Sequence, residues 1–328
     1  ESGGKPLAVS SKGYVVVVDE NNESESRLTL WHPGGTPERQ PIGIPKTNGQ
    51  EVAISPESQR IVSTVVNEGG SENSIQLWDI QGKPIGKPVK PDRDSSVLSI
   101  AFSPDGQQIV SGSIKFNGQS SVCLLHLQVD GLDKNKLCKP IPGNLSRVAF
   151  SPDNKTVAIG QKDGGLYLWN LQTNTMGQRF GATGQPVLSI AFSPDNKTIA
   201  SGNRDGSVRL WNLDGTPIGG AFQTYTNSTS VSSIAFNKAI GDGKTVIVAY
   251  TDGSVRFWQT TEDAFLQVAC NRLHDHPVLK DPKTEAAKGA KETCEKYVWN
   301  LPEQPGQNGE ITTSKTTPVT TPKSPVPK

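Results

Sequence analysis

Long hydrophobic runs and clustered charges are what this 328-residue sequence lacks. No apolar run is long enough to span a bilayer, which excludes a membrane-spanning helix, and no signal peptide is visible. The formal net charge is +1, and Lys and Arg form few clusters, which argues against a nucleic-acid partner. Because Met176 is the only methionine, we expect the chain to be processed or to be a piece of a longer one.

Sequence motifs for catalysis are also missing. The chain contains no Gly-x-Ser-x-Gly elbow and no glycine-rich loop followed by Lys at P-loop spacing. It has only four His: His32 follows a predicted strand end, His126 lies on a predicted strand, and His274 and His276 lie near the C-terminus. We therefore expect no catalytic residues, no cofactor and no enzyme activity.

One group of possible metal ligands lies in the C-terminal region. Cys270 and His274 are four residues apart and would share one face of a helix, with His276 and Cys294 nearby. Zinc binds Cys and His, but this spacing matches no known zinc finger. We predict no metal site, and expect the two Cys either to form a disulfide between helices or to stay packed thiols.

Residues 187–213 show the unit from which the chain is built. Three short apolar runs, 187–192, 198–201 and 208–211, are separated by the turn sequences Ser-Pro-Asp-Asn and Arg-Asp-Gly-Ser. Asp-Gly between two apolar runs is the strongest short-range signal for a hairpin. This stretch therefore predicts a three-stranded antiparallel meander.

The unit recurs with a period in the forties. Phe102, Phe150, Phe192 and Phe236 are 48, 42 and 44 residues apart, and Trp169, Trp211 and Trp258 repeat in step. Such a period, encoding strands and turns, indicates the blades of a propeller. Ala-Phe-Ser-Pro-Asp at 101–105, 149–153 and 191–195, with Asp-Gly-Ser-Val-Arg-Leu-Trp-Asn at 205–212, resembles the WD40 repeat family over roughly residues 5–260. The connector Gly-Lys-Pro-Ile-Gly-Lys-Pro at 82–88 is most similar to bacterial, cyanobacterial-type members.

The resemblance implies an all-β, WD40-like β-propeller of four-stranded antiparallel blades. We count six inner strand triplets, each followed by an outer strand except the last; a seven-bladed or incompletely closed ring is the alternative. We expect three regions: the propeller at 1–261, a short helical hairpin at 262–300 and a disordered tail rich in Pro, Thr, Ser and Lys at 301–328. The second helix would begin after Thr284 as its N-cap.

Two sets of residues recur in the triplets. We expect the third-strand tryptophans to pack between blades; they are Trp31, Trp78, Trp169, Trp211 and Trp258. In WD40 proteins this Trp joins a network with a Ser or Thr, a turn Asp and a connector His. The Asp positions here are Asp163, Asp205 and Asp252, but the connectors contain no His. We expect these Asp to accept hydrogen bonds from turn N–H groups instead.

The four Cys fall into two local pairs. A hairpin turning at Asp130-Gly131 would place Cys123 opposite Cys138, within reach of a disulfide, and Cys270 with Cys294 is the second pair. Two disulfides would indicate an oxidising compartment. The alternative is buried thiols in the cytoplasm, which the resemblance slightly favours over export to a periplasm or lumen.

The links between second and third strands carry the functional signal. They are long in the first three units and short in the others, and in a propeller they share one face with the connectors between blades. Loops on a rigid scaffold are where binding residues gather, and acidic loops would attract a basic partner. The predicted partner-binding residues are Glu20, Glu23, Glu25, Glu68, Glu72, Asp92, Arg93, Asp94, Lys115 and Phe116. The alternative interpretation is that these links are solvated loops whose length and sequence have drifted without a binding role.

We therefore expect a non-catalytic scaffold for protein–protein interaction, or a sensor or docking module, within a larger chain. Its partner would be a protein. The alternative is an exported propeller that binds a small molecule or a carbohydrate at the mouth of its channel.

Overall fold

The computed structural model describes most of residues 51–260 in full and, between residues 5 and 45, the backbone of strands only. Contacts divide the chain into two units, Glu1–Val255 and Arg256–Lys328. The ranges left undescribed are 1–4, 10–14, 20–24, 32–41, 46–50, 58, 67–72, 93, 134, 182, 223–228, 238–244, 261–269, 271–279, 281 and 296–328.

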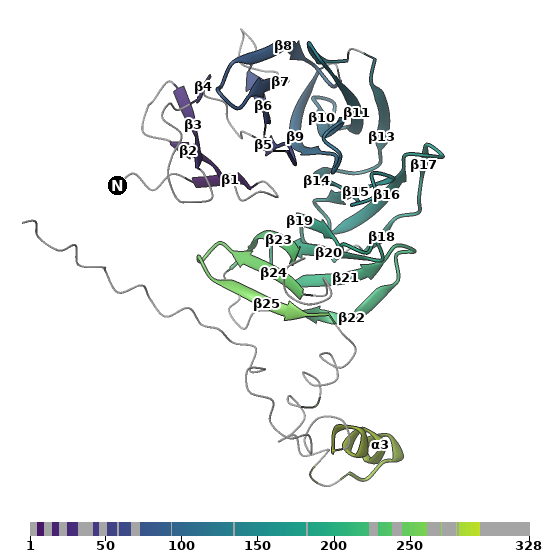
Figure 1. Ribbon diagram of the computed structural model, residues 1–328. Coiled ribbons are helices and arrows are strands. Elements are labelled where there is room, and N and C mark those ends of the chain that lie inside the picture. The colour runs from purple at the N-terminus through teal and green to yellow at the C-terminus, as the bar shows by residue number, and fades with distance from the viewer. Residues whose placement is uncertain are drawn as a thin grey trace, which may run out of the picture. The chain divides into compact units, whose positions relative to one another are not determined.

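Six antiparallel sheets, named blades 1 to 6 in chain order, follow one another along the sequence (Figure 1). Blade 1 contains β1 Lys5–Val9, β2 Val15–Asp19, β3 Glu25–Trp31 and β4 Ile42–Pro45. Blade 2 contains β5 Val52–Ile54, β6 Arg60–Val66, β7 Asn73–Asp79 and β8 Pro84–Val89. Blade 3 contains β9 Ser95–Phe102, β10 Gln108–Lys115, β11 Ser120–Gln128, β12 Gly131–Leu132 and β13 Leu137–Ile141.

The remaining blades repeat the plan. Blade 4 contains β14 Leu145–Phe150, β15 Thr156–Gln161, β16 Gly165–Asn170, β17 Thr175–Met176 and β18 Phe180–Gly181. Blade 5 contains β19 Val187–Phe192, β20 Thr198–Asn203, β21 Val208–Asn212 and β22 Pro217–Phe222. Blade 6 contains β23 Val231–Asn237, β24 Thr245–Tyr250 and β25 Val255–Gln259, with no fourth strand among the described residues.

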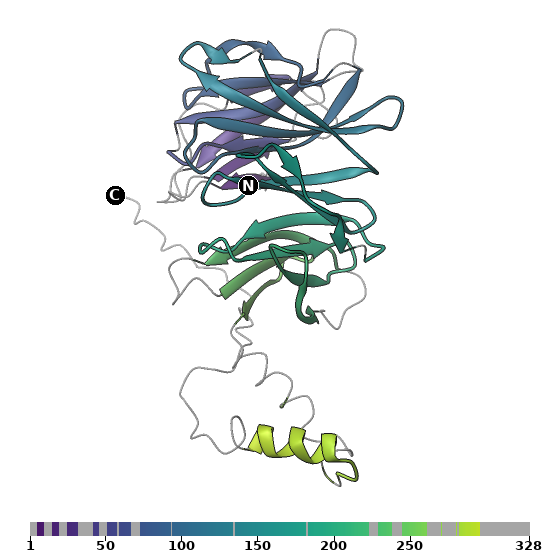
Figure 2. The same cartoon turned by 90° about the vertical axis from the view of Figure 1, so that its right-hand side faces the viewer.

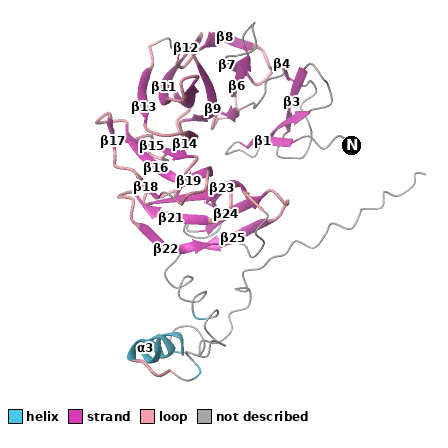
Figure 3. Cartoon of the chain, turned by 180° about the vertical axis from the view of Figure 1, so that it is seen from behind, coloured by secondary structure: helices cyan, strands magenta, loops and turns pink. Residues whose placement is uncertain are grey.

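The first strands of the blades are neighbours in chain order. Contacts join β1 to β5, β5 to β9, β9 to β14, β14 to β19 and β19 to β23, and these strands lie innermost in Figure 1. The outer strands lie away from them, and Figure 2 shows the successive sheets of unit 1 from the side. Strands dominate the described residues (Figure 3). The predicted all-β fold is confirmed, with four-stranded antiparallel sheets in blades 1, 2 and 5. Blades 3 and 4 have five strands, because two short strands pair with their third strand, and blade 6 has three described strands. The seven-bladed alternative gains no seventh sheet among the described residues.

Polar turns join the first and second strands, and hydrogen bonds between matching turns link neighbouring blades. In blade 3 the hydroxyl of Ser103 donates to Asp105 (2.6 Å) and accepts from the Gln108 N–H. The N–H of Asp105 donates to the side chain of Asn154 in the matching turn of blade 4. Asp153 and Asn196 repeat this link between blades 4 and 5. Since these turns lie side by side, the opposite ends of blades 3 to 5 lie side by side as well.

The core lies between the blades. One buried cluster joins Val110, Val122 and Leu124 of blade 3 to Trp169 and its neighbours of blade 4, and similar clusters join blades 2 to 3 and 4 to 5. Close approach requires glycine on the second strand: a Cβ on Gly112 would lie 2.4 Å from Leu145 Cδ2 of the next blade. Gly160 and Gly202 meet the next blade in the same way.

The register of blade 3 corrects one sequence inference. Cys123 does pair with Cys138, but the hairpin does not turn at Asp130-Gly131. Gln128 pairs with Gly131, so the turn residues are Val129 and Asp130. Extra residues between β12 and β13 then shift the register by two, which brings the cysteines opposite each other. The predicted pair of cysteines is therefore correct, but the predicted position of the turn is wrong by one residue.

In unit 2 the structure describes helix α3, Glu285–Cys294. Thr284 is its N-cap, as predicted, and its hydroxyl accepts from the Ala287 N–H at 3.2 Å. Cys294 at the other end of the helix is bonded to Cys270, and both are buried. Except for Cys270, the predicted first helix at 262–273 lies outside the described residues, as does the tail at 301–328.

Candidate functional site on the loop face

The loop face is defined here as the blade ends that carry the links β2–β3, β6–β7 and β10–β11, together with the connectors between blades. In blade 3 the link β10–β11 is a closed turn, because the Lys115 N–H donates to Gln119 O and the Gly118 N–H donates to Lys115 O. Phe116 lies in this turn with 62% of its surface exposed. A large apolar side chain is thus held in solvent on a short, hydrogen-bonded loop.

The connector from blade 2 supports this turn. Asp92 forms an ion pair with Lys115 Nζ at 3.2 Å and accepts from the Ser121 hydroxyl at 3.0 Å. The Phe116 N–H donates to the carbonyl of Asp94, whose φ is +53°. The backbone of Phe116 is therefore fixed from both sides, which lowers the ordering cost of a contact made by its side chain.

A cavity of about 350 Å³ lies beside this turn. One wall is the end of the link, Gly118 to Ser120, and the other is the connector to blade 4, Pro140 to Gly143. Ser120 pairs with Ile141 across β11 and β13, so the two walls are the ends of adjacent strands. Sequence reasoning missed this cavity; its signal is the Pro-Ile-Pro-Gly run at 140–143, which stiffens a connector.

The structure brings some of the predicted partner-binding residues together. Asp92, Asp94, Lys115 and Phe116 meet on blade 3, whereas Glu25 is placed by its backbone alone, paired with Pro45. Outside the described residues lie Glu20, Glu23, Glu68, Glu72 and Arg93. The acidic part of the predicted patch therefore stays a prediction.

A disulfide lies beneath the connector. Cys123 is bonded to Cys138, and the two sulfur atoms each lie 3.3 Å from the carbonyl oxygen of Pro91. The second disulfide, Cys270–Cys294, uses both cysteines of the conceivable zinc site, so neither can supply a thiolate. No group of possible metal ligands occurs among the described residues.

Blade 4 continues the loop face with a polar network. Arg179 donates to Asp163 and to Gln161, and Gln161 in turn donates to the carbonyl of Pro142 in the cavity wall. Burial acts to raise the pKa of Asp163, but the Gly165 N–H and the Arg179 guanidinium donate to it and hold the pKa below its usual value. Arg179 thus supplies a cation where the connectors lack His.

The other turn Asp residues are bound locally. Asp205 accepts from the N–H and hydroxyl of Ser207, and Asp252 accepts likewise from Ser254. These are short-range contacts within a turn. They stabilise the turns.

The tryptophans differ in their acceptors. Trp78 Nε1 donates to Ser63 and Trp211 Nε1 donates to Ser201, whereas Trp169, with Ile159 at the matching place, donates to Asn174. Trp31 is placed by its backbone on β3, and Trp258 is partly buried on β25. In blade 3 Leu125 replaces Trp, and the buried hydroxyl of Ser111 has no hydrogen-bond partner among the described residues.

This contrast gives a paired prediction. Ser201→Ala should lower the free energy of unfolding by about 1–3 kcal/mol, because the buried Trp211 N–H loses its acceptor. Ser111→Ala, the matched control, should be neutral or stabilising, because it removes a buried hydroxyl that has no partner. Denaturant unfolding of both variants measures the difference; equal losses of stability would contradict it.

Arg147 ties the inner strands together. Its Nε donates to Leu188 O of blade 5 at 2.8 Å, and its Nη1 donates to Glu51 at 2.9 Å and to Leu98 O of blade 3. Glu51 directly precedes β5 of blade 2, so one side chain of blade 4 contacts three other blades. Such ties keep the frame that carries the loop face rigid.

Three segments of the chain match a known family of repeats. The sequence model of the WD40 family (WD domain, G-beta repeat) matches residues 86–119, 136–170 and 175–212. Each match begins at or next to an outer strand, β8, β13 or β17, and runs into the following blade. These three segments are therefore similar to the WD40 class of repeats, and the structure folds them as successive antiparallel blades.

Curated relatives agree with this class. The chain is 28% identical over 104 residues to Protein LST8 homolog of Drosophila melanogaster, covering 30% of this chain and 32% of the relative. It is 33% identical over 124 residues to Telomerase protein component 1 of Rattus norvegicus (37% and 4% covered). It is 26% identical over 175 residues to WD repeat-containing protein 1 of Bos taurus (51% and 25% covered).

The matches thus span about a third or less of each of these relatives. WD40 proteins are typically non-catalytic scaffolds that bind protein partners. The resemblance of connector 82–88 to bacterial members stays a prediction, since these three relatives are animal proteins. No helix in the described part of the chain is both long and apolar enough to cross a membrane.

Proposed function

We propose that this chain is a non-catalytic docking module, within a larger chain, that binds a protein partner through the loop face of blades 1 to 3. The observation that carries the proposal is the exposure of Phe116, whose N–H is bound by Asp94 and whose neighbour Lys115 is bound by Asp92, beside a cavity of about 350 Å³. An exposed aromatic on a preformed support, next to a hollow that admits a partner side chain, is the usual centre of a protein interface.

Charge is the second support. The links of blades 1 and 2 carry Glu20, Glu23, Glu68 and Glu72, and neither link contains a Lys or Arg. Glu25 begins β3 directly after the first link. Acidic side chains at the rim of an interface attract a basic partner and raise the association rate more than they lower the dissociation rate. We infer that the partner presents an apolar side chain to the cavity and basic residues to these links.

A pair of charge reversals tests the proposal. Glu68→Lys/Glu72→Lys should reduce the rate of partner binding by about tenfold at low salt, and the loss should shrink as salt is raised. Asp130→Lys/Asp133→Lys, with the same change in charge at the opposite end of blade 3, should bind like the wild type. Surface plasmon resonance with a protein captured on the immobilised full chain measures the association and dissociation rates. Equal rates for the two variants would refute the acidic patch.

The second candidate is an exported propeller that binds a small molecule or a carbohydrate at the channel mouth. The two disulfides favour it, because disulfides persist in oxidising compartments. The Arg147–Glu51 pair argues against it, since a ligand among the inner strands would have to compete with that pair. A thermal shift assay with a panel of sugars tests this candidate. We expect no sugar to raise the Tm; a sugar that raises it would favour the second candidate.

A further inference from the structure

The Cys123–Cys138 disulfide lies where three parts of the loop face meet. It joins β11 to β13, and three residue pairs further along the same ladder Ser120 faces Ile141, which are the two walls of the cavity. Cys123 is fully buried, whereas Cys138 is partly exposed. The bond therefore fixes the spacing of the cavity walls from within the sheet, and the residue at its β13 end is partly exposed.

Strand β13 is short and, among the described strands, pairs on one side only, through five residue pairs with β11. The extra residues between β12 and β13 interrupt the ladder at one end. A strand of five residues at the edge of its sheet, with an interrupted ladder at one end, gains more from a covalent link than a longer central strand does.

The same disulfide also supports the connector below Phe116. Both sulfur atoms lie 3.3 Å from the Pro91 carbonyl, and Lys136, next to β13, donates to the carbonyl of Lys90. Pro91 directly precedes Asp92, which holds Lys115 and Ser121. A continuous path of contacts thus leads from the disulfide through the connector to the turn that carries Phe116.

We propose that the Cys123–Cys138 disulfide is a redox-sensitive clamp on the loop face, whose reduction loosens β13 and the connector together and weakens partner binding. The reductant is a dithiol. One of its thiolates attacks the sulfur of Cys138, the S–S bond breaks, and the departing Cys123 thiolate takes up a proton. The second thiol of the reductant then attacks the mixed disulfide, which releases Cys138 as a thiol and leaves the reductant as a disulfide two electrons poorer.

The effect on binding rests on the proposed function, so the first test needs no partner. Hydrogen–deuterium exchange of the full chain, before and after treatment with a dithiol, should accelerate by about tenfold or more at the amides of 92–95, 115–121 and 137–141. The amides of 198–212 in blade 5 should be unchanged. Unaltered exchange in the three segments on full reduction would overturn the clamp.

Two double variants separate the disulfides without any reductant. Cys123→Ala/Cys138→Ala should reproduce the faster exchange and lower partner affinity by about tenfold, because the face is no longer preorganised. Cys270→Ala/Cys294→Ala, the matched control, should change neither. A further outcome is that exchange accelerates as expected in Cys123→Ala/Cys138→Ala while neither that variant nor Phe116→Ala alters affinity. In that outcome the proposed function fails, and the effect of the disulfide on the order of the loop face stands.

Discussion

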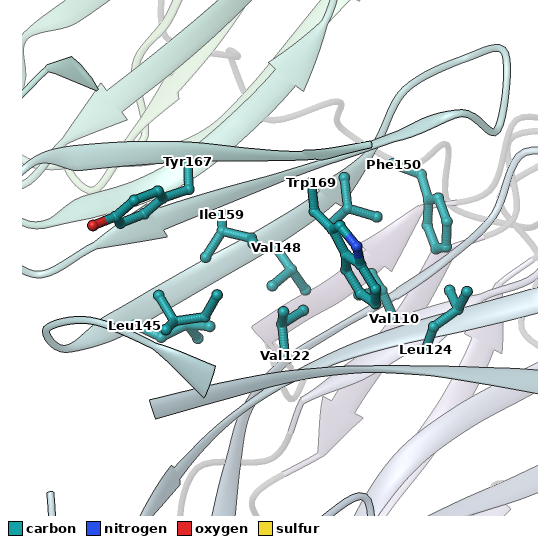
Figure 4. Packing of buried hydrophobic residues seen from close by; sticks show 11 residues of the cluster. Val110, Val122, Leu124, Leu145, Val148, Phe150, Ile159, Tyr167 and Trp169 are labelled. Atoms are coloured by element: carbon teal, nitrogen blue, oxygen red, sulfur yellow. The ribbon is translucent and has the colours of Figure 1, made fainter. Parts of the chain in front are cut away.

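Replacing Trp169 by alanine should lower the free energy of unfolding by about 3–5 kcal/mol, a large effect for a single truncation. Trp169 is fully buried on β16 of blade 4, and Figure 4 shows its ring among Val110, Val122 and Leu124 of blade 3. Truncation removes the ring from the seam between two blades. Because the walls belong to two different sheets, the cavity cannot close without moving one sheet against the other.

Thermal unfolding measures this loss. For a domain of this size the expected decrease in Tm is about 6–20 °C. Leu213→Ala is the control, since Leu213 is 40% exposed and its truncation should change stability by about 0.5 kcal/mol or less. A decrease for Trp169→Ala as small as that of the control would mean that blades 3 and 4 do not share this core.

Replacing Phe116 by alanine should weaken partner binding by about 10- to 100-fold while leaving the Tm within about 2 °C. The ring is 62% exposed in the free protein, so its removal leaves no internal cavity. Its backbone position depends on the Asp94 carbonyl and the turn at Lys115, which the substitution leaves intact. Affinity and stability should therefore separate in this variant.

Val129→Ala is the control for that loss. Val129 is 95% exposed and lies in the turn after β11, whereas Phe116 lies in the turn before it. The two changes remove exposed apolar side chains from opposite ends of the same sheet. Isothermal titration with the captured partner should show a loss for Phe116→Ala only; a loss confined to Val129→Ala would move the binding surface to the other end of the blades.

The repeating parts of the fold were predictable from the sequence, because similar turn and strand motifs recur from blade to blade. Ser-Pro-Asp turns, Asp-Gly hairpins and alternating apolar runs are short-range signals, and together they predicted the six inner strand triplets, although Ser-Pro-Asp turns occur in only three of them. The Cys123–Cys138 pairing also followed from spacing, although Val129 and Asp130, rather than Asp130 and Gly131, form the turn. No short-range sequence signal indicates that the pairing register with β11 shifts by two residues between β12 and β13.

The parts of the site that depend on contacts between blades could not be predicted. Arg147 pairs with Glu51, 96 residues away, and no periodic pattern singles out that pair. The cavity needs both the end of β11 and the connector to blade 4, which only the register of β13 brings together. Asp92, Asp94, Lys115 and Phe116 were predictable as loop residues, but their mutual contacts were not.

The measurement that tests the loop-face account most directly is site-specific photo-cross-linking in the full chain. A photoreactive phenylalanine analogue is placed at Phe116 in one variant and at Val129 in another, and each is irradiated with the captured partner. The account predicts an adduct from position 116 that excess unlabelled wild type prevents and excess Phe116→Ala does not, with no adduct from position 129. An adduct of equal or greater yield from position 129 would contradict it.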